Sequence, residues 1–103
     1  MVLVLTTFPD AACAREMAGR LLDEQLAACV SLLPAAESHY VWRGERQSAT
    51  EVPAMIKTTC EAYPQLEARL RELHPYDVPE IIELPVSRGW PAYVDWVRSS
   101  CGG

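Results

Sequence analysis

The chain has 103 residues, the usual length of one domain, and we expect a single domain over residues 1–103. Half of the residues are hydrophobic and 22% are charged, which fits a globular fold and argues against disorder. The net charge is −5, from 14 acidic against 9 basic residues, and Lys and Arg form no run. We therefore expect no nucleic-acid partner, because binding nucleic acid needs a basic face.

The apolar run at the N-terminus is too short for a signal peptide or a membrane span. It covers residues 2–5 and ends at Thr6. We therefore expect a cytoplasmic protein with no membrane partner. The four cysteines form no Cys-x-x-Cys pair and are expected to be free thiols; they are Cys13, Cys29, Cys60 and Cys101.

A strand and then a helix are predicted at the start of the chain. Residues 2–5 form a continuous aliphatic run, as in a strand that is covered on both faces. Pro9 and Asp10 break this strand, and Asp10 is a good N-cap for a helix. From residue 11 to residue 25 the apolar side chains recur at spacings of three and four, which predicts an amphipathic helix.

A long hairpin follows this helix. Residues 28–33 predict a second strand, which bends at Pro34 and resumes over 38–42. After a polar turn, a third strand is expected over 47–58, although Pro53 requires an edge or a bulge there. The hairpin would project beyond the helices, with Tyr40 and Trp42 on one face of its edge strand.

The rest of the chain completes a known arrangement of elements. A second helix is predicted over 60–73, a fourth strand over 80–86, and a last helix from Gly89, Trp90 and Pro91 onward. The fold class is α/β (α+β). We expect a ferredoxin-like βαββαβ sandwich with a long hairpin between its second and third strands and an extra C-terminal helix.

The hairpin also predicts self-association. An exposed strand edge that carries Tyr40 and Trp42 is a template for pairing with another chain. We therefore expect neighbouring copies of the same chain to cover it.

No catalytic machinery can be read from the sequence. It contains no Gly-rich phosphate loop, no G-x-S-x-G elbow and no H-E-x-x-H motif. Because no nucleophile–base pair can be named, we expect a protein that binds and does not catalyse.

His74 and Lys57 are the residues whose chemistry stands out. His74 follows a helix end, so it is either a capping or loop-ordering histidine or a contact to a metal or ligand. Around a symmetry axis, one histidine per chain could join ligands from neighbouring subunits. Lys57 interrupts an apolar strand and needs an anion if it is enclosed. That anion is either an acid, such as Glu51 or one from a neighbouring subunit, or a ligand.

Several short motifs occur together in the order and spacing of one family. They are Leu-Ala-Ala-Cys-Val at 26–30, Tyr-x-Trp-x-Gly at 40–44, Glu51 six residues before Lys-Thr at 57–58, His-Pro-Tyr-x-x-Pro-Glu at 74–80, Leu-Pro-Val at 84–86, Gly89, and Tyr-x-x-Trp at 93–96. Together they span nearly the whole chain. On these motifs the chain resembles the CutA divalent-cation-tolerance family.

The resemblance implies a ferredoxin-like homotrimer that packs through its long hairpins and is similar in architecture to trimeric PII signalling proteins. It implies a part in the tolerance of copper and other divalent metals, with copper or another divalent cation as the bound ion. It also implies a functional cleft between subunits. The residues that match the cleft are Tyr40, Trp42, Glu51, Lys57, Tyr76 and Glu80 as ligand contacts and His74 as the metal contact.

The chain departs from the family at a copper site described for some members. That site uses a cysteine at the end of the first strand and two histidines before the Pro-Tyr pair. Thr6, Leu73 and His74 occupy these positions here, so one of three ligands is present. This argues against thiolate-assisted copper binding at that place.

Three functions follow as hypotheses. The first is a homotrimeric cytoplasmic protein of divalent-metal (copper) tolerance that acts by binding, with a metal contact centred on His74. The second is a PII-like signalling trimer that binds a small anionic ligand in the intersubunit cleft through Lys57. The third is a structural or partner-binding trimer without a small ligand.

Overall fold

The computed structural model describes residues 1–102. β1 (Val2–Phe8) begins the chain, and every second side chain, from Val2 to Phe8, is buried on one face. The strand extends three residues beyond the aliphatic run that predicted it. Thr6 and Thr7 continue the alternation because β-branched threonine suits a strand as well as valine does.

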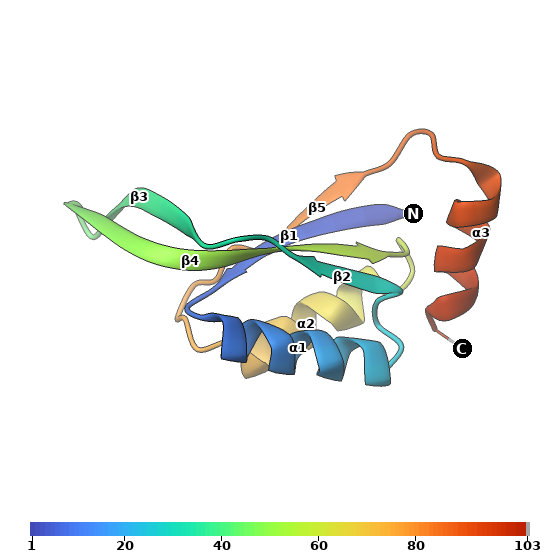
Figure 1. Ribbon diagram of the computed structural model, residues 1–103, viewed down its shortest axis with the longest axis horizontal. Coiled ribbons are helices and arrows are strands. Elements are labelled where there is room, and N and C mark those ends of the chain that lie inside the picture. Colours follow the sequence, from blue (N-terminus) through green and yellow to red (C-terminus); the bar gives the residue numbers. More distant parts are fainter. Residues whose placement is uncertain (103) are drawn as a thin grey trace.

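Two helices cover the same face of the sheet (Figure 1). α1 (Ala11–Asp23) begins where predicted, and the Asp10 carboxylate accepts a hydrogen bond from the Cys13 amide at 2.8 Å. α2 (Tyr63–Leu73) buries Leu66 and Leu70. These side chains and the buried face of β1 form one apolar core.

The sheet contains β2 (Cys29–Leu32), β3 (Ala36–Trp42), β4 (Glu45–Thr58) and β5 (Ile82–Pro85) besides β1. The strand order is β2-β4-β1-β5, every pairing is antiparallel, and β3 pairs with the far part of β4. The predicted βαββαβ arrangement and the long hairpin are therefore confirmed. The bent second strand counts as two strands, because its pairing with β4 is interrupted after Leu32.

Pro53 lies opposite this interruption. Its carbonyl accepts a hydrogen bond from the Leu33 amide. In a strand the nitrogen and the carbonyl of one residue point to the same side, so the proline nitrogen, which has no hydrogen to donate, also faces the bend between β2 and β3. On its other side Pro53 pairs in register with Thr7 of β1. A proline is therefore accommodated in a strand with neighbours on both sides, at the place where one of them breaks.

The hairpin turns through two residues with left-handed backbone, Arg43 at φ 52° and Gly44 at φ 81°. Two adjacent positive φ values between paired strands are characteristic of a type I′ turn, whose twist matches that of the strands. The turn holds β3 and the outer part of β4 together as they extend away from the helices (Figure 1).

α3 (Pro91–Ser100) lies beyond the end of the sheet, opposite the hairpin tip (Figure 1). Val97 is its buried anchor, whereas Trp90 and Trp96 are exposed. None of the helices in residues 1–102 is long and apolar enough to cross a bilayer.

The second face of the sheet has no helix over it in the described part of the chain (Figure 1). The strand registers place aliphatic side chains side by side on this face: Leu5 lies between Met55 and Ile82, and Leu3 lies beside Leu84. Ile82 and Leu84 are 48% and 43% exposed. We call these five residues the uncovered face.

Candidate functional site: a cleft beside the hairpin

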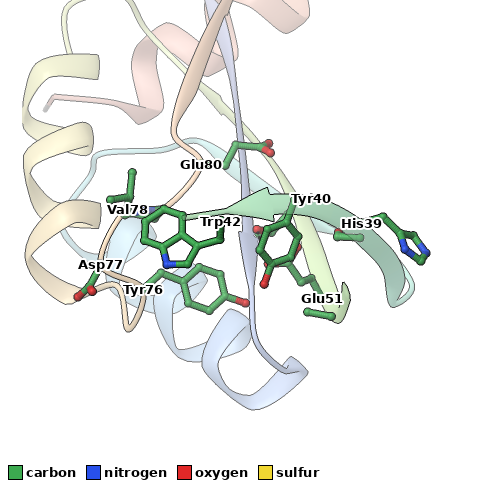
Figure 2. A pocket seen from close by; sticks show the side chains of 12 residues that line it. His39, Tyr40, Trp42, Glu51, Tyr76, Asp77, Val78 and Glu80 are labelled. Carbon is green, nitrogen blue, oxygen red and sulfur yellow. Dashed lines mark hydrogen bonds between the residues drawn. The ribbon is translucent and has the colours of Figure 1, made fainter. Parts of the chain in front are cut away.

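A cleft of about 850 Å³ lies between the hairpin and the segment that follows α2 (Figure 2). β3 and β4 form one side, residues 76–80 form the other, and Thr7 of β1 closes the base. Five of the six residues predicted as ligand contacts line it: Tyr40, Trp42, Glu51, Tyr76 and Glu80. Strand alternation explains this grouping, because Ser38, Tyr40 and Trp42 share one face of β3 and Glu51 lies across from that strand on β4.

Glu51 is the carboxylate of the cleft that lies among hydroxyl groups. The Thr7 hydroxyl donates a hydrogen bond to it at 3.0 Å, and the hydroxyls of Ser38 and Tyr76 lie nearby. Burial acts to raise the pKa of Glu51, but these hydroxyls and the proximity of His74 outweigh burial and lower the pKa below 4.5. The carboxylate is therefore ionised at neutral pH.

The Tyr76 phenol stays protonated. Burial, and then the neighbouring ionised Glu51, raise the pKa of the Tyr76 phenol. Its ring also lies against His74, with 4.8 Å between ring centroids. The ring and hydroxyl of Tyr76 are thus fixed from two directions.

His74 binds its surroundings with both ring nitrogens. Its Nδ1 accepts from the Tyr76 amide at 3.1 Å, so Nε2 carries the proton and donates to the Thr7 carbonyl at 2.7 Å. The ring stacks on Phe8 with 5.1 Å between centroids. Burial lowers the pKa of His74 despite the Thr7 bond and the Glu51 charge, which keeps the imidazole neutral.

His74 therefore orders the segment after α2, one of the two roles considered from the sequence. A metal contact through His74 stays a prediction. A metal ion there would replace one of its two hydrogen bonds.

Lys57 lies outside the cleft, toward the other end of β4. Its ammonium donates to the Ser31 hydroxyl and lies 3.8 Å from the Cys29 sulfur. Cys29 is half-buried beside it. The cleft therefore holds the other predicted ligand contacts without Lys57.

The positions that match the copper ligands of other family members do not converge on the cleft. Thr6 is 1% exposed, its hydroxyl lacks a hydrogen-bond partner within residues 1–102, and it faces the helices. Leu73 packs against the core. Among the described residues, no three His, Cys, Asp or Glu side chains lie close enough to hold a metal ion. All four cysteines are free thiols, as expected.

Sequence reasoning missed the polar residues that support Glu51. Thr7 was missed because β1 was predicted to end at residue 5, whereas the alternation of β1 continues to Phe8. Ser38 shares its face with Tyr40 and Trp42, so the spacing of two residues was a usable signal. Asp77 also lines the cleft, and nothing in the sequence distinguished it.

Comparison with known proteins places the chain among relatives of the same length. The family model described as "CutA1 divalent ion tolerance protein" matches residues 2–100. The divalent-cation tolerance protein CutA of Thermus thermophilus is 44% identical over 97% of both chains, and that of Pectobacterium atrosepticum is 44% identical over 96% of this chain and 90% of the relative.

Solved structures agree with this relationship. The Thermus thermophilus protein superposes with a TM-score of 0.95 over 99% of this chain and 100% of that chain. A variant of CutA1 from Pyrococcus horikoshii, 37% identical, gives a TM-score of 0.95 over 100% of both chains. Sequence and fold agree, and the chain belongs to the CutA1 divalent ion tolerance protein family.

Proposed function

We propose that this protein acts in divalent-cation tolerance by binding, without catalysis, and that its binding site is the cleft beside the hairpin. The observation that carries the proposal is the charge of the cleft. Glu51, Asp77 and Glu80 line it, and within residues 1–102 its lining includes neither Lys nor Arg. His39 also lines the cleft, but its exposed ring is bonded to Glu37. A cleft with three carboxylates and neither Lys nor Arg in its lining attracts cations and repels anions. The names of the relatives supply the process, tolerance of divalent cations.

Copper or another divalent cation at this site needs ligands from more than one chain or from a small molecule. The cleft offers carboxylate oxygens, which suit hard cations, while His74 offers the only buried imidazole. Three ligating side chains do not come together within residues 1–102. A second subunit that faces the cleft would raise the number of ligands, as symmetry allows.

A homotrimer is the assembly that we propose. The uncovered face supports it, because a sheet face rich in exposed leucine and isoleucine is stabilised when another copy covers it. Glu51 and Thr7 lie on the same side of the sheet as Leu5, so the cleft opens beside that face. The cytoplasm is the proposed compartment, where four free cysteines stay reduced.

The anionic-ligand alternative, a PII-like sensor, needs a basic side chain in the cleft. Lys57 was the candidate, but its ammonium already donates to Ser31 outside the cleft. No other observation favours this alternative, so we do not adopt it.

Isothermal titration of the assembled protein with Cu(II), Zn(II) and inorganic phosphate tests the proposal. We expect saturable binding of at least one metal and none of phosphate. Glu51→Gln keeps the size of the side chain and removes its charge, so it should weaken metal binding. Glu61→Gln removes an exposed charge outside the cleft and should leave binding unchanged. Phosphate binding without metal binding, or equal metal affinity in both variants, would overturn the proposal.

A further inference from the structure

We propose that the cleft recognises an organic cation, a small molecule with an alkylammonium or guanidinium group, held among three aromatic rings beside Glu51. This inference rests on the proposed role of the cleft as a cation site and names the class of ligand. The rings are those of Tyr40, Trp42 and Tyr76.

The aromatic lining is the first argument. Figure 2 shows the rings of Tyr40 and Trp42 from β3 and the ring of Tyr76 from the opposite side gathered along the cleft. In the single chain Tyr40 and Trp42 keep 45% and 40% of their surface exposed. Arg43 lies over the Trp42 ring, so the surface that a ligand can reach is the rest of that ring and the ring of Tyr40. Aromatic faces attract cations through their quadrupole, and tryptophan does so most strongly.

The rigidity of this lining is the second argument. Tyr76 is fixed by His74 behind its ring and by Glu51 at its hydroxyl. His74 in turn is fixed by the Thr7 carbonyl and by Phe8. A ring that is already ordered loses little entropy when a ligand binds.

The charge of Glu51 is the third argument. The Thr7 hydroxyl donates to it, and the hydroxyls of Ser38 and Tyr76 lie nearby; none of these groups carries a charge. Among residues 1–102 it forms no salt bridge with Lys or Arg, whereas Glu16, Glu24 and Glu72 each form one. A half-buried carboxylate is stabilised by a countercharge, and a cationic ligand supplies it.

The size of the cleft favours an organic cation over a bare metal ion as its ligand. The cleft volume, about 850 Å³, lies within the range of roughly 300–1,000 Å³ that small-molecule sites occupy. A bare ion needs several converging ligands, which one chain does not offer. An ammonium or guanidinium group needs only ring faces and a carboxylate. Arg43 shows that a guanidinium group fits against the Trp42 ring, since its guanidinium carbon lies 5.6 Å from the ring centroid.

A pair of probes of equal shape tests the inference in the assembled wild-type protein. Choline carries a trimethylammonium group, and 3,3-dimethylbutan-1-ol replaces its nitrogen with carbon and is neutral. We expect isothermal titration to show choline binding at least about tenfold more tightly than the neutral alcohol. Methylguanidinium is expected to compete with choline.

Two tryptophan variants provide the matched control. Trp42→Leu removes a ring of the cleft and should weaken choline binding at least about fivefold. Trp90→Leu removes an exposed tryptophan before α3, away from the cleft, and should leave choline affinity unchanged. Glu51→Gln should weaken choline binding as well, and urea unfolding of each variant shows that it is folded.

The outcomes distinguish this inference from the proposed function. Cu(II) or Zn(II) binding without choline binding would overturn the organic-cation inference and leave the proposed function standing. Choline binding without metal binding would support the inference and contradict a metal at this site. Equal affinity for choline and the neutral alcohol, or equal loss in Trp42→Leu and Trp90→Leu, would also overturn the inference.

Discussion

His74 connects β1 to the segment after α2 through one side chain. It bonds to the end of β1 at Thr7, stacks on Phe8, and accepts a hydrogen bond from the amide of Tyr76 beyond α2. The cleft depends on this arrangement, because Tyr76 and Glu51 take their positions from the same contacts.

His74→Ala should therefore destabilise the protein by about 2–4 kcal/mol, since it removes a buried ring with two hydrogen bonds and leaves a half-buried carbonyl and amide without these partners. Urea unfolding measures the change. His39→Ala is the control, because His39 is exposed and bonds only to exposed Glu37, and it should cost under about 1 kcal/mol. Equal losses in the two variants would contradict the role given to His74.

The pKa of His74 predicts the pH dependence of stability. The folded protein holds this pKa below 6.5, the value of a free histidine, so the unfolded state binds more protons as the pH falls through 6.5. The free energy of unfolding should therefore decrease between pH 7.5 and pH 5. Urea unfolding across this range, compared with His74→Gln, should show a weaker pH dependence in the variant. A stability that rises as the pH falls would contradict the prediction.

At the scale of the elements, the hairpin turn places two adjacent residues, Arg43 and Gly44, in left-handed backbone. Arg43 adopts φ 52°, which costs an ordinary side chain energy that asparagine largely avoids. Arg43→Asn should raise the free energy of unfolding by about 0.5–1 kcal/mol. Arg46→Asn, on β4 just beyond the turn, removes the same charge without relieving strain and should give no gain. Thermal or urea unfolding distinguishes the two, and an equal gain in both would refute the turn argument.

The elements also show how far the sequence could predict this fold. Periodicity was sufficient for α1, whose cap at Asp10 and apolar spacing are local signals. The strands were harder, since β1 was predicted too short when two threonines ended its aliphatic run. The break between β2 and β3 could be placed at Pro34, but the matching position of Pro53 opposite it depends on strand register, which no local pattern shows.

The residues of the site were also only partly predictable from the sequence. Tyr40 and Trp42 follow from alternation along one strand, and the family motifs supplied Glu51, Tyr76 and Glu80. The motifs also carried Lys57, which lies outside the cleft because β4 is long and Lys57 is near its inner end. That three hydroxyls from three segments surround Glu51 could not be foreseen, because those segments meet only in the folded chain.

At the scale of the whole molecule, we expect copies of the chain to assemble through the uncovered face. Leu84 lies on it, 43% exposed, and Leu22 on α1 is equally exposed at 43% on the other side of the sheet. Leu84→Asp should dissociate the proposed trimer, because it places a charge in an apolar contact. Leu22→Asp should leave the trimer intact. Sedimentation velocity measures both, and a trimer that survives Leu84→Asp as well as Leu22→Asp would exclude this face as the interface.

The central claim is that an assembly of identical chains binds cations in the cleft beside the hairpin. Native mass spectrometry of the protein with and without Cu(II), Zn(II) and choline tests it most directly. We predict a mass of three chains that gains whole multiples of at least one cation and loses this uptake in Glu51→Gln but not in Glu61→Gln. Single chains, or an uptake that Glu51→Gln leaves unchanged, would contradict the claim.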